Sequence, residues 1–144
     1  MRKLLWIAAL VSSVVWLSSC IVIVKEEKRV PHEPEVVYIS AEGAIEEIDA
    51  VGELAFDTDR LAGYKRIAAR EGLSDSAQAH LVRAVYEKLS FESAKKEVLL
   101  TLIQNPSFGR AAEQAILDQL GSLSFEDTKR EILNAIDQRK YGGT

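Results

Sequence analysis

The sequence contains one cysteine, Cys20, and two histidines in 144 residues. With a single cysteine, no disulfide can form within the chain, and a zinc site would have to be built mainly from other residue types. Clusters of Lys and Arg are also lacking, because 18 basic residues face 22 acidic ones and the net charge is −4. Nucleic-acid binding depends on clustered basic residues. We therefore expect no nucleic-acid partner, no metal and no other cofactor.

The first twenty residues have the order of a secretion signal. Arg2 and Lys3 give a positive start, an apolar run covers residues 4–17, and small residues precede Cys20. Leu17-Ser18-Ser19-Cys20 resembles the lipobox of bacterial lipoproteins. The resemblance implies that a signal peptidase recognises Leu17, Ser18 and Ser19, removes residues 1–19, and leaves a lipidated Cys20 as the mature N-terminus.

Lipidation at Cys20 would place the chain in the cell envelope, anchored to a membrane with its domain outside the cytoplasm. Each buried CH2 of an acyl chain contributes about 0.8 kcal/mol, so two or three chains hold a protein firmly. Ile21 follows the cysteine where an Asp would favour retention, which points to an outer membrane facing the periplasm in a Gram-negative host. Two alternatives stay open: an uncleaved apolar anchor over residues 4–24, and a buried structural cysteine.

Residues 20–38 form the lipidated N-terminus and a predicted extended tether. The stretch from Lys25 to Glu35 reads KEEKRVPHEPE and has almost no apolar residue. Such a segment cannot bury a core. His32 lies within it, and we expect a solvated side chain there. The remaining residues, 39–144, are long enough for one domain with one core.

This domain is predicted to be all-α, with about six short antiparallel helices stacked as hairpins, after the N-terminal signal helix and the linker. Candidate N-cap residues recur every 16 or 17 residues, at Ser40, Asp57, Ser74, Ser90, Ser107 and Ser124. A 34-residue helix-pair repeat is indicated by Leu89-Ser-Phe-Glu and Leu123-Ser-Phe-Glu, with Leu54-Ala-Phe-Asp as a weaker first copy. We expect Phe91 and Phe125, like Phe56, to anchor each helix pair to the next.

The run Phe56-Asp57-Thr58-Asp59-Arg60-Leu61, followed by Gln78 and the Phe91 motif, resembles a bacterial domain family of unknown function. That family is built of short helix pairs headed by Phe-Asp-x-Asp-Arg-Leu, and it occurs in exported proteins. The resemblance therefore implies helix pairs and export, with no activity. The second copy departs from the motif, because Ser93 and Ala94 follow Phe91-Glu92 and no Asp-Arg pair comes after them.

Few residues suggest catalytic or metal chemistry. Asp57 and Asp59 have the spacing of a calcium loop, but its later ligands and its Gly are absent, so favourable interaction with the helix dipole explains them better. His80 has Ser76 and Glu87 on the same predicted helix, but one short helix face seldom holds a catalytic triad. Acidic residues between 42 and 53 precede basic residues between 65 and 70, which predicts attraction between neighbouring helices. An acidic face that binds a partner is the alternative interpretation.

We therefore expect a membrane-anchored, non-catalytic module for protein interaction or structure. Its partners would be the membrane, through Cys20, and possibly another envelope protein, with no small-molecule ligand. A small envelope hydrolase acting on cell-wall material is the alternative, and it predicts a concave pocket around His80. A structural lipoprotein with no specific ligand is the third reading.

Overall fold

The computed structural model describes residues 40–141, so the predicted signal, the lipobox and the tether of residues 20–38 all fall outside it. The described part contains six α-helices and one short 3-10 helix: α1 (Ala41–Gly52), α2 (Asp57–Ala68), α3 (Asp75–Lys88), α4 (Glu92–Gln104), α5 (Arg110–Gln119), η1 (Leu120–Ser122) and α6 (Glu126–Tyr141). The prediction of an all-α domain of six antiparallel helices is confirmed.

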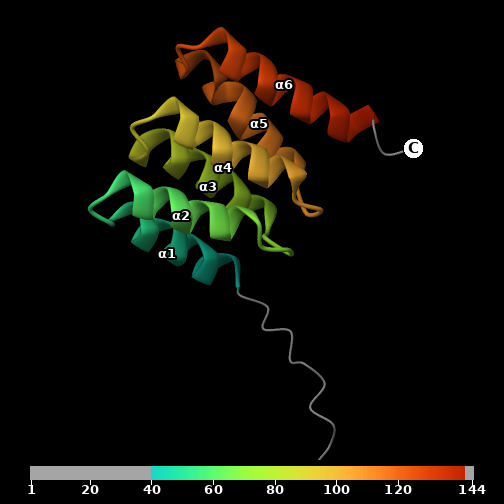
Figure 1. Ribbon diagram of the computed structural model, residues 1–144. Helices are drawn as coiled ribbons and strands as arrows, with labels where there is room; N and C mark the ends of the chain where they lie inside the picture. Colours follow the sequence, from blue (N-terminus) through green and yellow to red (C-terminus); the bar gives the residue numbers. More distant parts are fainter. Residues whose placement is uncertain (1–39, 142–144) are drawn as a thin grey trace, which may run out of the picture. The chain divides into compact units, whose positions relative to one another are not determined.

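The helices form two stacked layers (Figure 1). Contacts run from α1 to α3 to α5 in one layer, and from α2 to α4 to α6 in the other. Short connections make each successive helix antiparallel to the one before. The loops that lead into α2, α4 and α6 therefore share one edge of the domain. The start of α1, at Ser40, lies at the opposite edge.

The core lies between the two layers. In α4, the buried residues Ala94, Val98, Leu99, Leu102 and Ile103 form an apolar stripe, because positions three and four apart share one face of a helix. The first and last helices present polar outer faces, with Glu42 and Glu46 exposed on α1 and Asn134 and Asp137 exposed on α6. Polar end faces let a helical array stop without exposing its core.

Two of the six predicted N-caps are confirmed. Ser40 accepts a hydrogen bond from the Gly43 N–H, and Ser74 accepts one from the Ala77 N–H. The other four predictions, at Asp57, Ser90, Ser107 and Ser124, are wrong. The caps of α2, α4 and α5 are Phe56, Phe91 and Gly109, and none of the three makes a side-chain cap bond. The helix that follows Ser124 begins at Glu126.

The helix starts are displaced because these residues bond to the neighbouring hairpin. The Ser90 N–H donates to the Asp57 carboxylate at 2.9 Å, and Glu92 in turn accepts from the backbone N–H groups of Ser124 and Phe125. Each Leu-Ser-Phe segment is thereby held extended before its helix begins. At the opposite edge, the Ser107 hydroxyl accepts the N–H of Gly72, whose φ is +76°.

Two buried amides hold the loops at that opposite edge. Gln78 donates to the carbonyls of Leu73 and Ser107, both at 2.7 Å, and accepts the Gly109 N–H. Asn105 donates to the carbonyls of Ala68 and Arg70 and accepts the Ser107 N–H. Because buried backbone groups need partners, these side chains fix where α2 ends and where α5 begins.

The predicted charge attraction between the first two helices is confirmed. Glu47 of α1 pairs with Arg66, near the C-terminal end of α2, at 3.3 Å. It also pairs with Arg70, two residues after α2 ends, at 2.7 Å. Within residues 40–141, no helix is both long enough and apolar enough to cross a membrane.

Candidate binding surface

Phe56, Phe91 and Phe125 do not anchor one helix pair to the next, and that prediction is wrong. Their exposed fractions are 68%, 65% and 65%. The leucine two residues earlier occupies the interior instead, since Leu89 and Leu123 are almost fully buried. In a regular extended segment, residues two apart point to the same side. Here α4 and α6 begin at the residue after each phenylalanine, so the chain turns and the leucine and phenylalanine point to different sides. The leucine therefore enters the core while the phenylalanine faces solvent.

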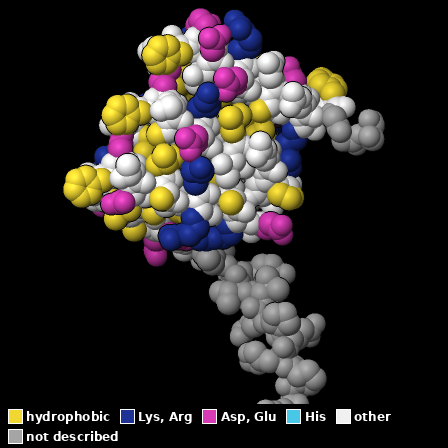
Figure 2. Space-filling model, in the orientation of Figure 1, with side chains coloured by type: hydrophobic (Ala, Val, Ile, Leu, Met, Phe, Trp, Pro, Cys, Tyr) yellow, Lys and Arg dark blue, Asp and Glu magenta, His cyan; other side chains and the backbone are white. Residues whose placement is uncertain are grey.

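The three phenylalanines lie at the same place in three successive hairpins, directly before α2, α4 and α6. Hydrophobic side chains project along the left edge of Figure 2, where these helices begin. Leu54 adds to this surface at 41% exposure, because it belongs to the first hairpin and has no earlier one to cover it. We call Leu54, Phe56, Phe91 and Phe125 the aromatic edge.

The remaining residues of the Phe-Asp-x-Asp-Arg-Leu motif support this edge. The Ser90 N–H lowers the pKa of the Asp57 carboxyl, and Arg60 lowers it further through an ion pair at 2.8 Å. Asp59 is exposed. Leu61 lines a groove beside Phe91. The motif thus joins α2 to the next hairpin and shapes the surface between them.

That groove is a small, mainly apolar pocket of about 170 Å³ between α2 and α4. Its lining residues are Asp57, Thr58, Leu61, Phe91, Ser93, Ala94 and Glu97. At the corresponding position between α4 and α6, Lys96 replaces Leu61 and pairs with Glu131 at 2.8 Å. The two grooves therefore differ, and the first is the one that can take an apolar side chain. The sequence analysis did not predict this pocket. The difference between Leu61 and Lys96, which lie at the same position of two repeat copies, can nevertheless be read from the sequence.

Exposed charge around the aromatic edge is mainly negative. Four carboxylate side chains there expose between 73% and 86% of their surface: Glu53, Glu87, Glu126 and Asp127. The basic side chains of Arg60, Lys88 and Lys129 expose only 20% to 36%, since each lies against the protein beside an acid. Arg130 is the exposed exception. In Figure 2, acidic side chains lie beside the hydrophobic ones along this edge.

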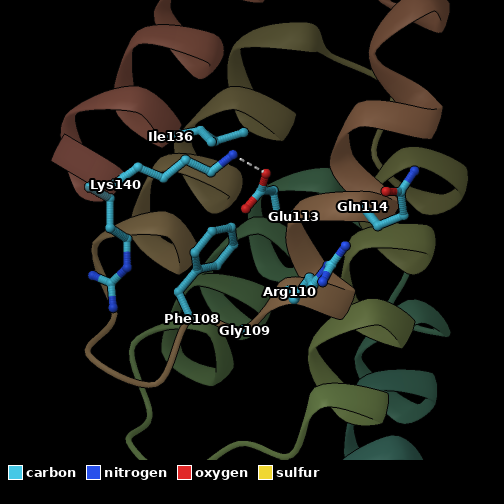
Figure 3. Close-up of a pocket in the computed structure, with 8 residues that line it drawn as sticks. Phe108, Gly109, Arg110, Glu113, Gln114, Ile136 and Lys140 are labelled. Carbon is cyan, nitrogen blue, oxygen red and sulfur yellow. Dashed lines mark hydrogen bonds and ion pairs between the residues drawn. The ribbon is translucent and has the colours of Figure 1, made fainter.

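A larger pocket, of about 480 Å³, lies between the start of α5 and the end of α6 (Figure 3). Lys140 reaches across it to Glu113, while Arg110 lies on the other side of that carboxylate. Arg139 donates to the Pro106 carbonyl and lies over the Phe108 ring. Two of the three cations of the pocket are thus engaged by the protein itself.

The residues considered for catalysis are not brought together. His80 contacts Asp49, with Nε2 and Oδ1 2.6 Å apart. The Ser76 hydroxyl contacts that of Ser74, and Glu87 pairs with Lys88. Within the described residues, no group of three or more His, Cys, Asp or Glu side chains is placed to hold a metal ion. Gln78, which follows the Phe-Asp-x-Asp-Arg-Leu run in the sequence, has the structural role described above.

Comparison of the chain with family models, with curated proteins and with solved structures found no match. The resemblance of residues 54–108 to the family of unknown function therefore stays a prediction. Lipidation of Cys20, with peptidase recognition at Leu17, Ser18 and Ser19, lies outside residues 40–141 and also stays a prediction.

Proposed function

We propose that this chain is a lipid-anchored, non-catalytic interaction module of the bacterial cell envelope, and that its aromatic edge binds another envelope protein. One observation carries the proposal: the phenylalanine of each hairpin is exposed where a core position was expected. Exposing one large apolar side chain is ordinary, but exposing one at the same position of three successive hairpins calls for an explanation. Aromatic side chains, phenylalanine among them, are also enriched at protein interfaces relative to the rest of the surface.

The lipid anchor rests on the sequence alone. The lipobox-like segment ending at Cys20 supports it, as do the apolar run before it and the polar stretch after it. Intact-mass measurement of the chain purified from cell membranes tests it. We expect an N-terminus at Cys20 with added acyl mass, and Cys20→Ala should abolish both the mass and the membrane association. An unmodified chain that keeps Met1 would contradict the anchor.

A photo-crosslinking experiment tests the aromatic edge. We replace Phe91 with the photoreactive residue p-benzoylphenylalanine in the full chain and irradiate intact cells. Tyr141 is the matched control position, because it is an aromatic residue with 80% exposure that lies at the opposite end of its helix from the edge. We expect discrete adducts from position 91 and few from position 141. Equal or absent adducts at both positions would contradict the proposed function.

A further inference from the structure

We propose that the aromatic edge binds an extended, positively charged segment of its partner, a proposal that rests on the proposed function. This segment presents an apolar side chain on one face about every third residue. The phenylalanines would contact these apolar side chains. The carboxylates around them would attract the Lys or Arg residues between.

The width of the edge favours a segment over a folded partner. An aromatic side chain has about 150–250 Å² of surface, so three that are two-thirds exposed offer roughly 400 Å². A stable protein complex buries about 800 Å² on each partner, which is about twice that area. The edge is also one phenylalanine wide, because each hairpin contributes a single one. The three phenylalanines alone therefore supply about half of the total surface that a stable dimer buries on each partner, so a single segment fits this narrow edge better than a second copy does.

The spacing of the edge favours an extended conformation. Neighbouring helices pack about 8–10 Å apart, and Phe56, Phe91 and Phe125 occupy equivalent positions on neighbouring helices of one layer. A polyproline II segment returns to the same face after about 9 Å, which lies within this range. An α-helix returns to the same face after seven residues, or about 10.5 Å, so the extended segment is the closer match to this spacing.

The pocket between α2 and α4 sets the register of the segment. One apolar side chain can enter beside Phe91 and rest on Leu61. The next groove cannot take it in the same way, because Lys96 and its ion pair with Glu131 stand where Leu61 does. The partner thus needs its best-fitting apolar residue opposite Phe91, flanked by less demanding contacts at the other two phenylalanines.

The exposed charges around the aromatic edge indicate that the bound segment is positively charged. The most exposed charged groups at the edge are carboxylates. The basic side chains are less exposed because they lie against the protein in local ion pairs, and Arg130 is the exposed exception. Complementary potentials raise association rates and reject partners of like charge. An anionic lipid surface is disfavoured for the same reason, although exposed phenylalanines alone would suit a membrane.

Fluorescence anisotropy with designed peptides tests this proposal. The full chain, purified from membranes, is reconstituted in vesicles of neutral phosphatidylcholine. Three labelled peptides are added: four repeats of Leu-Lys-Pro, the acidic counterpart with Leu-Glu-Pro, and the polar counterpart with Ser-Lys-Pro. We expect the first to bind at least about tenfold more tightly than either counterpart. Its affinity should also fall as salt is raised, since the carboxylates are exposed.

Variants locate the binding. Phe91→Ser and Leu61→Lys should each weaken binding of the Leu-Lys-Pro peptide by about tenfold, as expected for a central contact residue. Tyr141→Ser, the control, should leave the affinity unchanged. Circular dichroism checks that each variant is folded, and Phe91 is a safe position because its side chain is mostly exposed. The proposal would be overturned if Phe91→Ser left the affinity for the Leu-Lys-Pro peptide unchanged, or if all three peptides bound equally well.

Two further outcomes would overturn it in favour of another occupant. Binding to phosphatidylglycerol vesicles that Phe91→Ser abolishes would identify a membrane surface. Concentration-dependent dimerisation that Phe91→Ser abolishes would identify a second copy. The crosslinking experiment separates this proposal from the proposed function: adducts at position 91 without peptide binding reject only the partner chemistry, and absence of adducts rejects the interaction module itself.

Discussion

Among single residues, the buried amides of Gln78 and Asn105 have the largest structural consequence. Each satisfies three backbone groups in loops at the edge opposite the phenylalanines. Gln78 lies within the buried stripe of α3, between Ala77 and Leu81. A polar residue in an apolar stripe is a signal that could have marked it. Asn105 follows α4 and has no such pattern, so only the tertiary contacts reveal its role.

Asn105→Ala should lower the free energy of unfolding by about 2–3 kcal/mol, because it leaves the carbonyls of Ala68 and Arg70 and the N–H of Ser107 without their partner. Urea unfolding measures the change. Asn134→Ala is the control, since Asn134 is exposed on the outer face of α6. A loss at Asn105 no larger than at Asn134 would show that water replaces these hydrogen bonds without cost.

Among the helices, most features could be predicted from periodicity, and the exact starts could not. The stripe of α4 and the caps at Ser40 and Ser74 follow from local rules, because each involves residues within one helical turn. The starts of α4 and α6 depend on Asp57 and Glu92, more than thirty residues away. No local pattern reports such a contact, which is why the predicted caps at Ser90 and Ser124 were wrong.

The contact of α1 with α2 depends on Gly63. A Cβ at this position would lie 2.7 Å and 2.9 Å from the two methyl groups of Val51. Gly63→Ala should therefore destabilise the protein by about 1–3 kcal/mol, even though alanine favours a helix by about 1 kcal/mol over glycine. Thermal and urea unfolding measure this. Gly121→Ala is the control, since nothing lies within 4 Å of a Cβ there.

Val51→Ala supplies the complementary test of that contact. Removing the methyl groups makes room for the new Cβ, so the two substitutions should be strongly non-additive. We expect the double variant to be at least as stable as Val51→Ala alone. If the two effects simply add, the helices do not meet at Gly63 as described.

In the molecule as a whole, two carboxylates link the three hairpins. The free energy of unfolding should therefore fall as the solution is acidified. Backbone N–H groups that donate to Asp57 and Glu92 lower the pKa of both carboxyls. A lowered folded-state pKa stabilises the fold above the unfolded-state value, and this contribution is lost as the pH falls through the folded-state value. We expect the free energy of unfolding to decline as the pH falls below about 5.

The variant Asp57→Asn with Glu92→Gln should be less stable at neutral pH and should lose less stability on acidification. Urea unfolding at a series of pH values measures both effects. Glu46→Gln, which removes an exposed carboxylate of α1 with no hydrogen bond in the described part of the chain, is the control for loss of charge alone. An unchanged slope in the double variant would mean that other carboxylates carry the acid dependence.

The candidate site was only half visible in the sequence. The repeated phenylalanines were singled out, but they were expected to anchor each helix pair to the next and not to face solvent. Whether an aromatic residue just before a helix turns inward or outward depends on the path of the preceding loop, and here Leu89 takes the inner place. The groove over Leu61 needed the packing of α2 on α4, which is a tertiary property.

The chain enters α1 at Ser40, whereas the phenylalanines begin only after α1 has ended. The twelve residues of α1 make a rigid spacer of roughly 18 Å. In the proposed anchored form, the end of the tether at Ser40 stays roughly that distance from a partner bound at Phe56. Shortening the proposed tether would reduce how far the domain can travel, but it would not bring Ser40 any closer to the partner.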